Sequence, residues 1–141
     1  MESFHEYMKE YRKQLGKGSI QKAYRGLMDY FMDLRTYFKN KYPDYVISGS
    51  IYYGYMDITY FSFFPKTLKQ QNLKIAIVFL HEPFRFEAWL AGYNKQVQEK
   101  YWKLLKESGW NKYTIVSTIK GVDSIMEHVL VDHADFSDLE A

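Results

Sequence analysis

The 141-residue chain contains no cysteine, only three prolines, and no apolar run near the roughly 20 residues that a membrane-spanning helix needs. Without cysteine the chain has no disulfide, iron–sulfur cluster, thiolate zinc site or thiol nucleophile. The N-terminal segment mixes charges and lacks the apolar core of a secretory signal, so we expect a cytoplasmic protein without a membrane span. No phosphate loop or nucleophile elbow is present, and we expect no cofactor.

Aromatic residues are abundant instead, at 19% of the chain, and they include 14 tyrosines. Many of these tyrosines lie between Tyr37 and Tyr60. A large apolar ring with a polar hydroxyl suits a half-wet surface or a pocket as well as a core. The length fits one hydrophobic core. We therefore predict a single domain over residues 1–141, with residues 132–141 as a frayed acidic tail.

Charge divides the chain into a basic body and an acidic end. All 19 Lys and Arg residues lie at or before Lys120, and residues 1–122 carry a formal charge of +8. Residues 123–141 hold six acidic residues and no basic one, and they either pack back onto the body or serve as a solubilising tail. The basic residues are spread over several predicted helices, and the pI of about 8.6 is below the value of about 9 typical of nucleic-acid-binding domains. We therefore do not expect nucleic acid to be the partner.

The strongest structural signal is residues 73–91, two apolar runs joined by a polar turn that begins at His81 and is expected to be exposed. Residues 75–80 are apolar at every position, which is typical of a strand covered on both faces. In the second run, Arg85, Glu87 and Trp89 share the face opposite to the apolar residues, because side chains alternate along a strand. The pattern predicts a β-hairpin at the centre of a sheet.

Apolar residues recur at helical spacing in the N-terminal part of the chain. A capping box at Ser3 and Glu6 predicts a helix over about residues 4–15. A second helix is predicted to begin with Ser19 as its cap and to end before Pro43, because a residue that precedes proline avoids the helical conformation. The apolar stripe of this second helix is predicted to face the core.

The rest of the chain alternates between strand and helix patterns. Residues 45–64 predict one or two strands, and residues 112–119 predict another. An amphipathic helix is predicted after Gly92 with Gly109 at its end, and a last helix is predicted from Asp123. The expected order is α-α-β-β-β-α-β-α. This order indicates an α+β fold with a mostly antiparallel meander sheet of about 4–5 strands and helices packed chiefly on one face.

Polar side chains of two predicted strands are expected to share the sheet face that is turned away from the core. In the segment 53–61, odd-numbered residues are predicted to lie on this face and even-numbered residues to face the core. The candidate ligand-binding site consists of Tyr53, Tyr55, Asp57, Thr59, Arg85, Glu87 and Trp89. An arginine beside a carboxylate is also an ordinary cross-strand ion pair, so a purely structural role remains an alternative.

Two further sites have alternatives of their own. Asn94 and Gln98 could bind an anion at the start of the predicted helix, or Asn94 could cap the helix while Gln98 is solvated. Asp57 and Glu87 could hold a divalent metal in a nuclease-like phosphodiester hydrolase. Such nucleases carry a lysine two residues after the acid, whereas this chain has Trp89 there. We therefore assign no metal site.

Three stretches, SGSIYYGYMDITYF, LKIAIVFLHE and FRFEAWLAGYNKQVQEKYW, resemble a family of small bacterial proteins described as a domain of unknown function. The resemblance spans residues 42–110 and implies a bacterial, intracellular, single-domain protein, without an activity to transfer. The favoured function is a binding module whose sheet face receives a small molecule or a protein. Metal-dependent phosphodiester hydrolysis and nucleic-acid binding remain alternatives, and the oligomeric state is left open.

Overall fold

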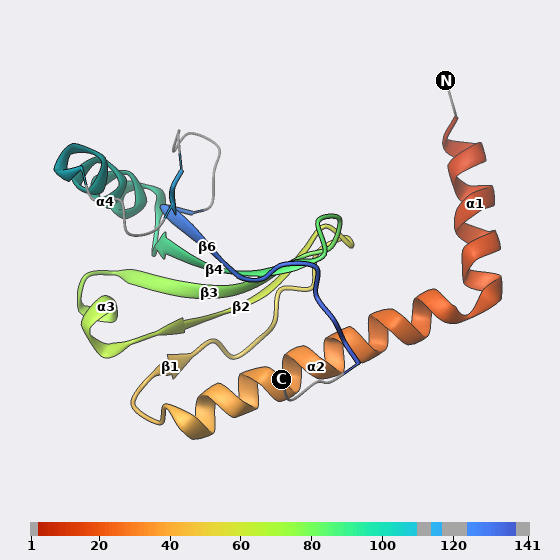
Figure 1. Cartoon of the computed structure of the whole chain (residues 1–141), viewed down its shortest axis with the longest axis horizontal. Coiled ribbons are helices and arrows are strands. Elements are labelled where there is room, and N and C mark those ends of the chain that lie inside the picture. Colours follow the sequence, from red (N-terminus) through yellow and green to blue (C-terminus); the bar gives the residue numbers. More distant parts are fainter. Residues whose placement is uncertain (1–2, 110–113, 117–123, 138–141) are drawn as a thin grey trace.

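The computed structural model describes residues 3–109, 114–116 and 124–137 (Figure 1). The helices are α1 (Phe4–Lys17), α2 (Ser19–Lys41), α3 (Lys66–Gln70) and α4 (Lys95–Ser108). The strands are β1 (Val46–Ile47), β2 (Ile58–Phe64), β3 (Leu73–Leu80), β4 (Arg85–Gly92), β5 (Thr114–Ile115) and β6 (Met126–Val131). They form one antiparallel sheet in the order β1-β2-β3-β4-β6-β5. The predicted α+β class with an antiparallel sheet is confirmed.

The hairpin of β3 and β4 lies at the centre of this sheet, as the sequence predicted. The two strands pair along their whole length, from Leu73 opposite Gly92 to Leu80 opposite Arg85. The central strand β3 is buried on both faces, which explains its continuous apolar pattern. Within the described residues, no helix is long and apolar enough to cross a lipid bilayer.

Helix α2 lies against one face of the sheet, below it in Figure 1, and encloses the main core there. Phe31 of α2 is fully buried, and its ring centroid lies 6.3 Å from that of Phe61 in β2 and 5.9 Å from that of Phe86 in β4. Burying one such side chain stabilises a fold by about 1.5–3 kcal/mol. The aromatic contacts between α2 and the two strands therefore hold the helix on the sheet.

Helix α4 lies above the left end of the sheet in Figure 1, on the side away from α2, and packs against β4. Its first turn comes so close to Gly92 that a Cβ atom there would lie 2.4 Å from the backbone nitrogen of Gln98. A side chain would clash, so the glycine permits this approach. Gly109 ends α4 in the left-handed conformation, as its position in the sequence predicted.

The predicted last helix from Asp123 is wrong in the part that the structure describes, because residues 126–131 form strand β6. Met126 pairs with Leu90 of β4, and the backbone N–H of Ile125 donates to the carbonyl of Leu90 over 2.7 Å. Without β6 this edge of β4 would expose unpaired backbone groups, so pairing stabilises the extended form. The predicted strand 112–119 is represented by β5, and residues 110–113 and 117–123 lie outside the described part.

The two predicted N-terminal caps have different outcomes. The Ser3 hydroxyl accepts a hydrogen bond from the Glu6 backbone N–H over 3.3 Å, which confirms the first cap. The second prediction is wrong, because α2 already includes Ser19 and its N-cap is Gly18, with φ +78°. Gly18 also ends α1, so a single glycine forms the sharp junction between the two helices.

The described part of the predicted tail, residues 132–137, is anchored rather than frayed. The backbone N–H of Ala134 donates to the carbonyl of Phe84 over 2.8 Å, and the Phe136 ring lies against Phe79 and Tyr30. These contacts are apolar and backbone contacts. Residues 138–141 lie outside the described part.

Helix α1 projects away from the sheet in Figure 1 and has no buried residue. We expect removal of residues 1–17 to lower the free energy of unfolding by less than about 1 kcal/mol, because changes outside the core usually have small effects. The Phe31→Ala change should cost about 3–5 kcal/mol, since it opens a cavity in the core. Urea unfolding followed by circular dichroism measures both. A deletion as costly as Phe31→Ala would show that α1 supports the core.

Candidate functional site

The structure brings Arg85, Glu87 and Trp89 together on the sheet face opposite α2, as the sequence predicted. Glu87 is 2% exposed. One carboxylate oxygen, Oε2, accepts a hydrogen bond from Nε of Arg85 over 2.5 Å, and the other, Oε1, accepts one from the indole N–H of Trp89 over 2.8 Å. The hydrogen bond and the charge of Glu87 raise the pKa of Arg85. Both carboxylate oxygens are therefore occupied within the protein.

The predicted face assignment in β2 is wrong. Thr59 pairs with Phe79, and Phe79 pairs with Phe86, so Thr59 lies on the α2 face. Thr59 is fully buried, and the neighbouring even-numbered residue, Tyr60, lies on the face that carries Glu87. The alternation was recognised, but both faces of this strand carry aromatic residues. Sequence alone could not tell which face α2 would cover.

Tyr53, Tyr55 and Asp57 belong to the turn that precedes β2, not to a strand beside β3. The Asp57 carboxylate accepts hydrogen bonds from the backbone N–H groups of Tyr55 and Ile58, over 2.9 and 2.8 Å, and these bonds lower the pKa of Asp57. Gly54 lies in the same turn with φ +72°, and a Cβ atom there would lie 2.1 Å from the carbonyl oxygen of Ile58. Asp57 thus stabilises a tight turn.

Asn94 and Gln98 take structural positions at the start of α4. The Asn94 side chain accepts a hydrogen bond from the Val97 backbone N–H over 2.9 Å, which confirms the capping alternative. Gln98 is buried, so the alternative that it is solvated is wrong, and its side-chain oxygen accepts a bond from the Gly92 N–H over 3.4 Å. Both side chains thus fasten α4 to the end of β4.

The metal-dependent alternative would use Asp57 and Glu87. Asp57 bonds to backbone N–H groups in a turn, and both oxygens of Glu87 bond to its own strand neighbours. Among the described residues, no group of three or more histidine, aspartate and glutamate side chains is placed to hold a metal ion. The described geometry therefore does not assemble the metal ligands that this alternative needs.

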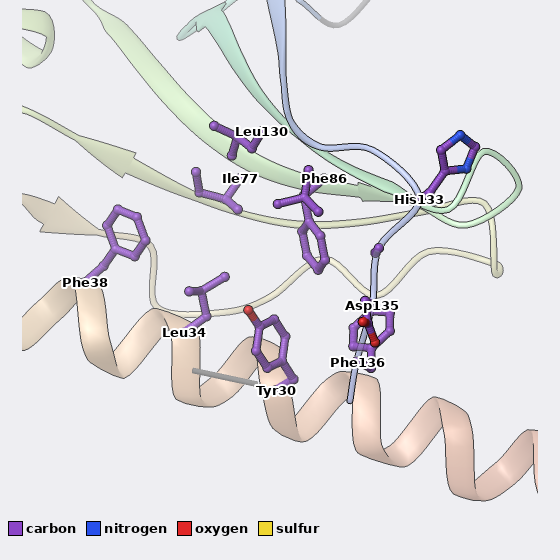
Figure 2. A pocket seen from close by; sticks show the side chains of 11 residues that line it. Tyr30, Leu34, Phe38, Ile77, Phe86, Leu130, His133, Asp135 and Phe136 are labelled. Atoms are coloured by element: carbon purple, nitrogen blue, oxygen red, sulfur yellow. The ribbon is translucent and has the colours of Figure 1, made fainter. Parts of the chain in front are cut away.

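Two pockets lie on the face of the sheet that α2 covers, between the helix and the strands. The middle pocket has a volume of about 360 Å³ and is shown in Figure 2. In that view Leu34 and Tyr30 of α2 point up toward Phe86 of β4, and Phe136 closes one side beside Tyr30. His133 points away from it. The walls of the middle pocket are mainly apolar.

The turn pocket has a volume of about 640 Å³ and lies where the N-terminal half of α2 passes the turn between β3 and β4. Its lining residues come from α2, β3, the turn before β2, the turn between β3 and β4, and the C-terminal segment: Ile20, Lys22, Ala23, Tyr24, Gly26, Leu27, Tyr30, Met56, Phe79, His81, Glu82, Phe84 and Phe136. Tyr30 and Phe136 also line the middle pocket, so they separate the two hollows. The volume falls within the range of small-molecule sites.

His81 is the polar group at the inner wall of the turn pocket. Its Nε2 atom lies 2.8 Å from the hydroxyl oxygen of buried Thr59. Its ring stacks on Tyr24 of α2 with 6.5 Å between centroids, and it meets the edge of Phe79 at 5.0 Å. Partial burial lowers the pKa of His81, while the charge of Asp57 raises it by a smaller amount. The imidazole is therefore held in a fixed position and favours its neutral form.

The sequence did not identify this pocket. His81 occupies a polar turn between two strands, where an exposed histidine is the usual outcome. One signal was present: the apolar stripe of α2 extends to Ala23 and Ile20, well before the residues that pack on the sheet. A stripe longer than the surface that covers it leaves an apolar wall open.

We expect the Trp89→Phe variant to lose about 1.5–3 kcal/mol of unfolding free energy, because the buried Glu87 carboxylate loses a charge-assisted hydrogen bond. Trp102→Phe is the matched control, since its indole donates over 2.8 Å to the neutral Val116 carbonyl and should contribute about 1 kcal/mol. Urea unfolding measures both. A loss for Trp89→Phe no larger than the control would refute the role given to the Glu87 network.

The lowered pKa of His81 predicts a pH dependence of stability. Its ordinary value is 6.5, so between 6.5 and the lower folded value the unfolded chain binds more protons. The contribution of His81 to stability is therefore complete above this window and falls as the pH decreases through it. In urea unfolding, the stability difference between the wild type and His81→Gln should shift against the wild type from pH 7.5 to pH 5.5. An unchanged difference would contradict the burial of His81.

Comparison with known protein families gives a match that covers the residues of both the Glu87 network and the turn pocket. The family described as Domain of unknown function (DUF7000) matches residues 4–141. The searches of curated proteins and of solved structures give no match. The resemblance to a domain of unknown function is therefore confirmed, and it extends over almost the whole length. The chain belongs to the DUF7000 family.

Proposed function

We propose that this chain is a binding module that holds a small, largely apolar ligand in the turn pocket. The observation that carries the proposal is the pocket itself: about 640 Å³, walled by aromatic and aliphatic side chains, with His81 on its inner wall. Ligand sites combine apolar walls with a few positioned polar groups.

Helix α2 supports the proposal because its first turn carries an apolar residue that the sheet does not cover. Phe31 is fully buried under the sheet, whereas Ile20 on the same helix is 40% exposed. An exposed apolar wall lowers solubility without contributing to the core, and such surfaces often mark binding sites. A ligand in the turn pocket would cover this wall.

Gly26 adds a second reason. It lies inside α2, where glycine destabilises a helix by about 0.5–1 kcal/mol relative to alanine. Apart from its chain neighbours and the nearby backbone of its own helix, a Cβ atom at Gly26 would meet nothing within 4 Å, so packing does not require a glycine there. Gly26 lines the turn pocket. The missing side chain therefore leaves room in the pocket, at a small cost in helix stability.

The sheet-face site around Arg85, Glu87 and Trp89 remains a second candidate for a ligand or a partner. The Glu87 carboxylate already accepts hydrogen bonds from Arg85 and Trp89, and a ligand that bound to Glu87 would have to break them. The turn pocket requires no such exchange. For this reason we favour the turn pocket.

The test is a titration of the full chain with naphthalene and 2-naphthol, followed by two-dimensional NMR. We expect resonances of residues around His81 and Tyr24 to shift. The Gly26→Trp variant should weaken binding by about tenfold or more, because the indole fills the pocket. Gly16→Trp is the matched control, since Gly16 is also a helical glycine with open space around it but does not line the pocket. Absence of binding, or equal binding by both variants, would disprove the proposal.

A further inference from the structure

We infer that the turn pocket selects aromatic ligands that carry a hydroxyl or N–H group, and that this group donates a hydrogen bond to Nδ1 of His81. The inference rests on the proposed function and adds the chemical class of the ligand. It depends on which nitrogen of His81 carries the proton, on the access of the other nitrogen to solvent, and on the charges around the pocket.

The hydrogen bonds of Thr59 determine the tautomer of His81. A threonine hydroxyl has one proton, and that of Thr59 donates to the backbone carbonyl of Tyr53 over 2.8 Å. A carbonyl cannot donate, so the Thr59 proton must lie in the bond to Tyr53 and cannot be donated to His81. The contact between the Thr59 oxygen and Nε2 of His81 therefore needs the proton on Nε2. In a neutral imidazole, Nδ1 is then an acceptor.

Nδ1 is accessible. Within the described part of the chain, the Thr59 contact is the one hydrogen bond that the His81 side chain makes, so no protein group there donates to Nδ1. Among the described side chains, no nitrogen or oxygen atom is both buried and without a hydrogen-bond partner. Nδ1 therefore contacts solvent, and His81 lines the turn pocket. A ligand that fills the pocket covers this acceptor and must supply a donor, because a covered polar atom without a partner is unfavourable.

The surroundings hold this acceptor in place. Tyr24 stacks on the His81 ring, and its hydroxyl donates to the Tyr53 carbonyl over 3.5 Å. Phe79 of the core contacts the His81 ring in a T-shaped arrangement. The same carbonyl of Tyr53 thus accepts from Tyr24 and Thr59, which links α2 to the turn before β2. A preorganised acceptor loses little conformational freedom when a ligand binds.

The charges around the pocket favour a neutral ligand. Among the described residues that line the pocket, one side chain is cationic, Lys22, and one is anionic, Glu82, and both are exposed. Asp57 is the charged group that acts on His81 from the neighbouring turn. An anionic ligand would face Nδ1, which offers no proton, and a cationic ligand would face mainly apolar walls. A neutral aromatic ring with one donor matches both the Nδ1 acceptor and the apolar walls.

The experiment compares 2-naphthol with 2-methoxynaphthalene, which has the same ring system but no donor, at pH 7.5. For each protein we compare the ratio of the two dissociation constants, corrected for the difference in water-to-octanol transfer between the two compounds. In the wild type this ratio should favour 2-naphthol by about three- to tenfold. His81→Phe keeps an aromatic ring beside Tyr24 but removes the acceptor, so the ratio should fall to about one. His81→Gln can donate to Thr59 and still accept from a ligand, so it should retain part of the preference.

The outcomes separate the two proposals. Equal binding of both compounds by the wild type would overturn the donor preference but leave the pocket as a binding site. Binding of neither compound would overturn the proposed function itself. Long-range ¹⁵N–¹H correlation spectra of the wild type give an independent readout that needs no variant. They should show a neutral His81 with its proton on Nε2, and a proton on Nδ1 would overturn the inference.

Discussion

The packing of α2 on the hairpin of β3 and β4 is the contact on which the rest of this structure depends. Phe31 is fully buried between Phe61 and Phe86, and the C-terminal segment is added to the same aromatic layer through Phe136. Because this layer lies toward the middle of α2, the first turns of the helix extend beyond it. The turn pocket is thus a direct consequence of a helix that is longer than the surface it covers.

The polar groups on the two faces of the sheet are stabilised in different ways. On the face opposite α2, a buried carboxylate is neutralised by Arg85 and oriented by Trp89, so that Glu87 can lie in the sheet without an unpaired charge. On the α2 face, polar groups occur at the turn end, where Thr59 and His81 meet at the edge of the aromatic layer. Both oxygens of Glu87 are hydrogen-bonded within the protein, whereas Nδ1 of His81 remains accessible to solvent.

The candidate site shows where sequence reasoning reaches its limit. The grouping of Arg85, Glu87 and Trp89 followed from the two-residue period of a strand, which needs no knowledge of the partner strands. The sequence analysis also assigned Asp57 and Thr59 to this group. That assignment required knowing which face of β2 the helix α2 would cover, and the pattern could not decide this because both faces of β2 carry aromatic residues. His81 could not be identified at all, because its neighbours Thr59 and Tyr24 are distant in the chain.

The sequence by itself determined the central hairpin, the first two helices, the helix between Asn94 and Gly109, and the α+β class. Their signals are local, since periodicity and capping act within a few residues. Only the tertiary structure decided residues 126–131, whose apolar pattern is compatible with a helix or a strand. The free edge of β4 supplied backbone hydrogen-bond partners, and these favoured the strand. The turn pocket likewise exists only in the folded chain, because its walls come from segments that meet when α2 packs on the sheet.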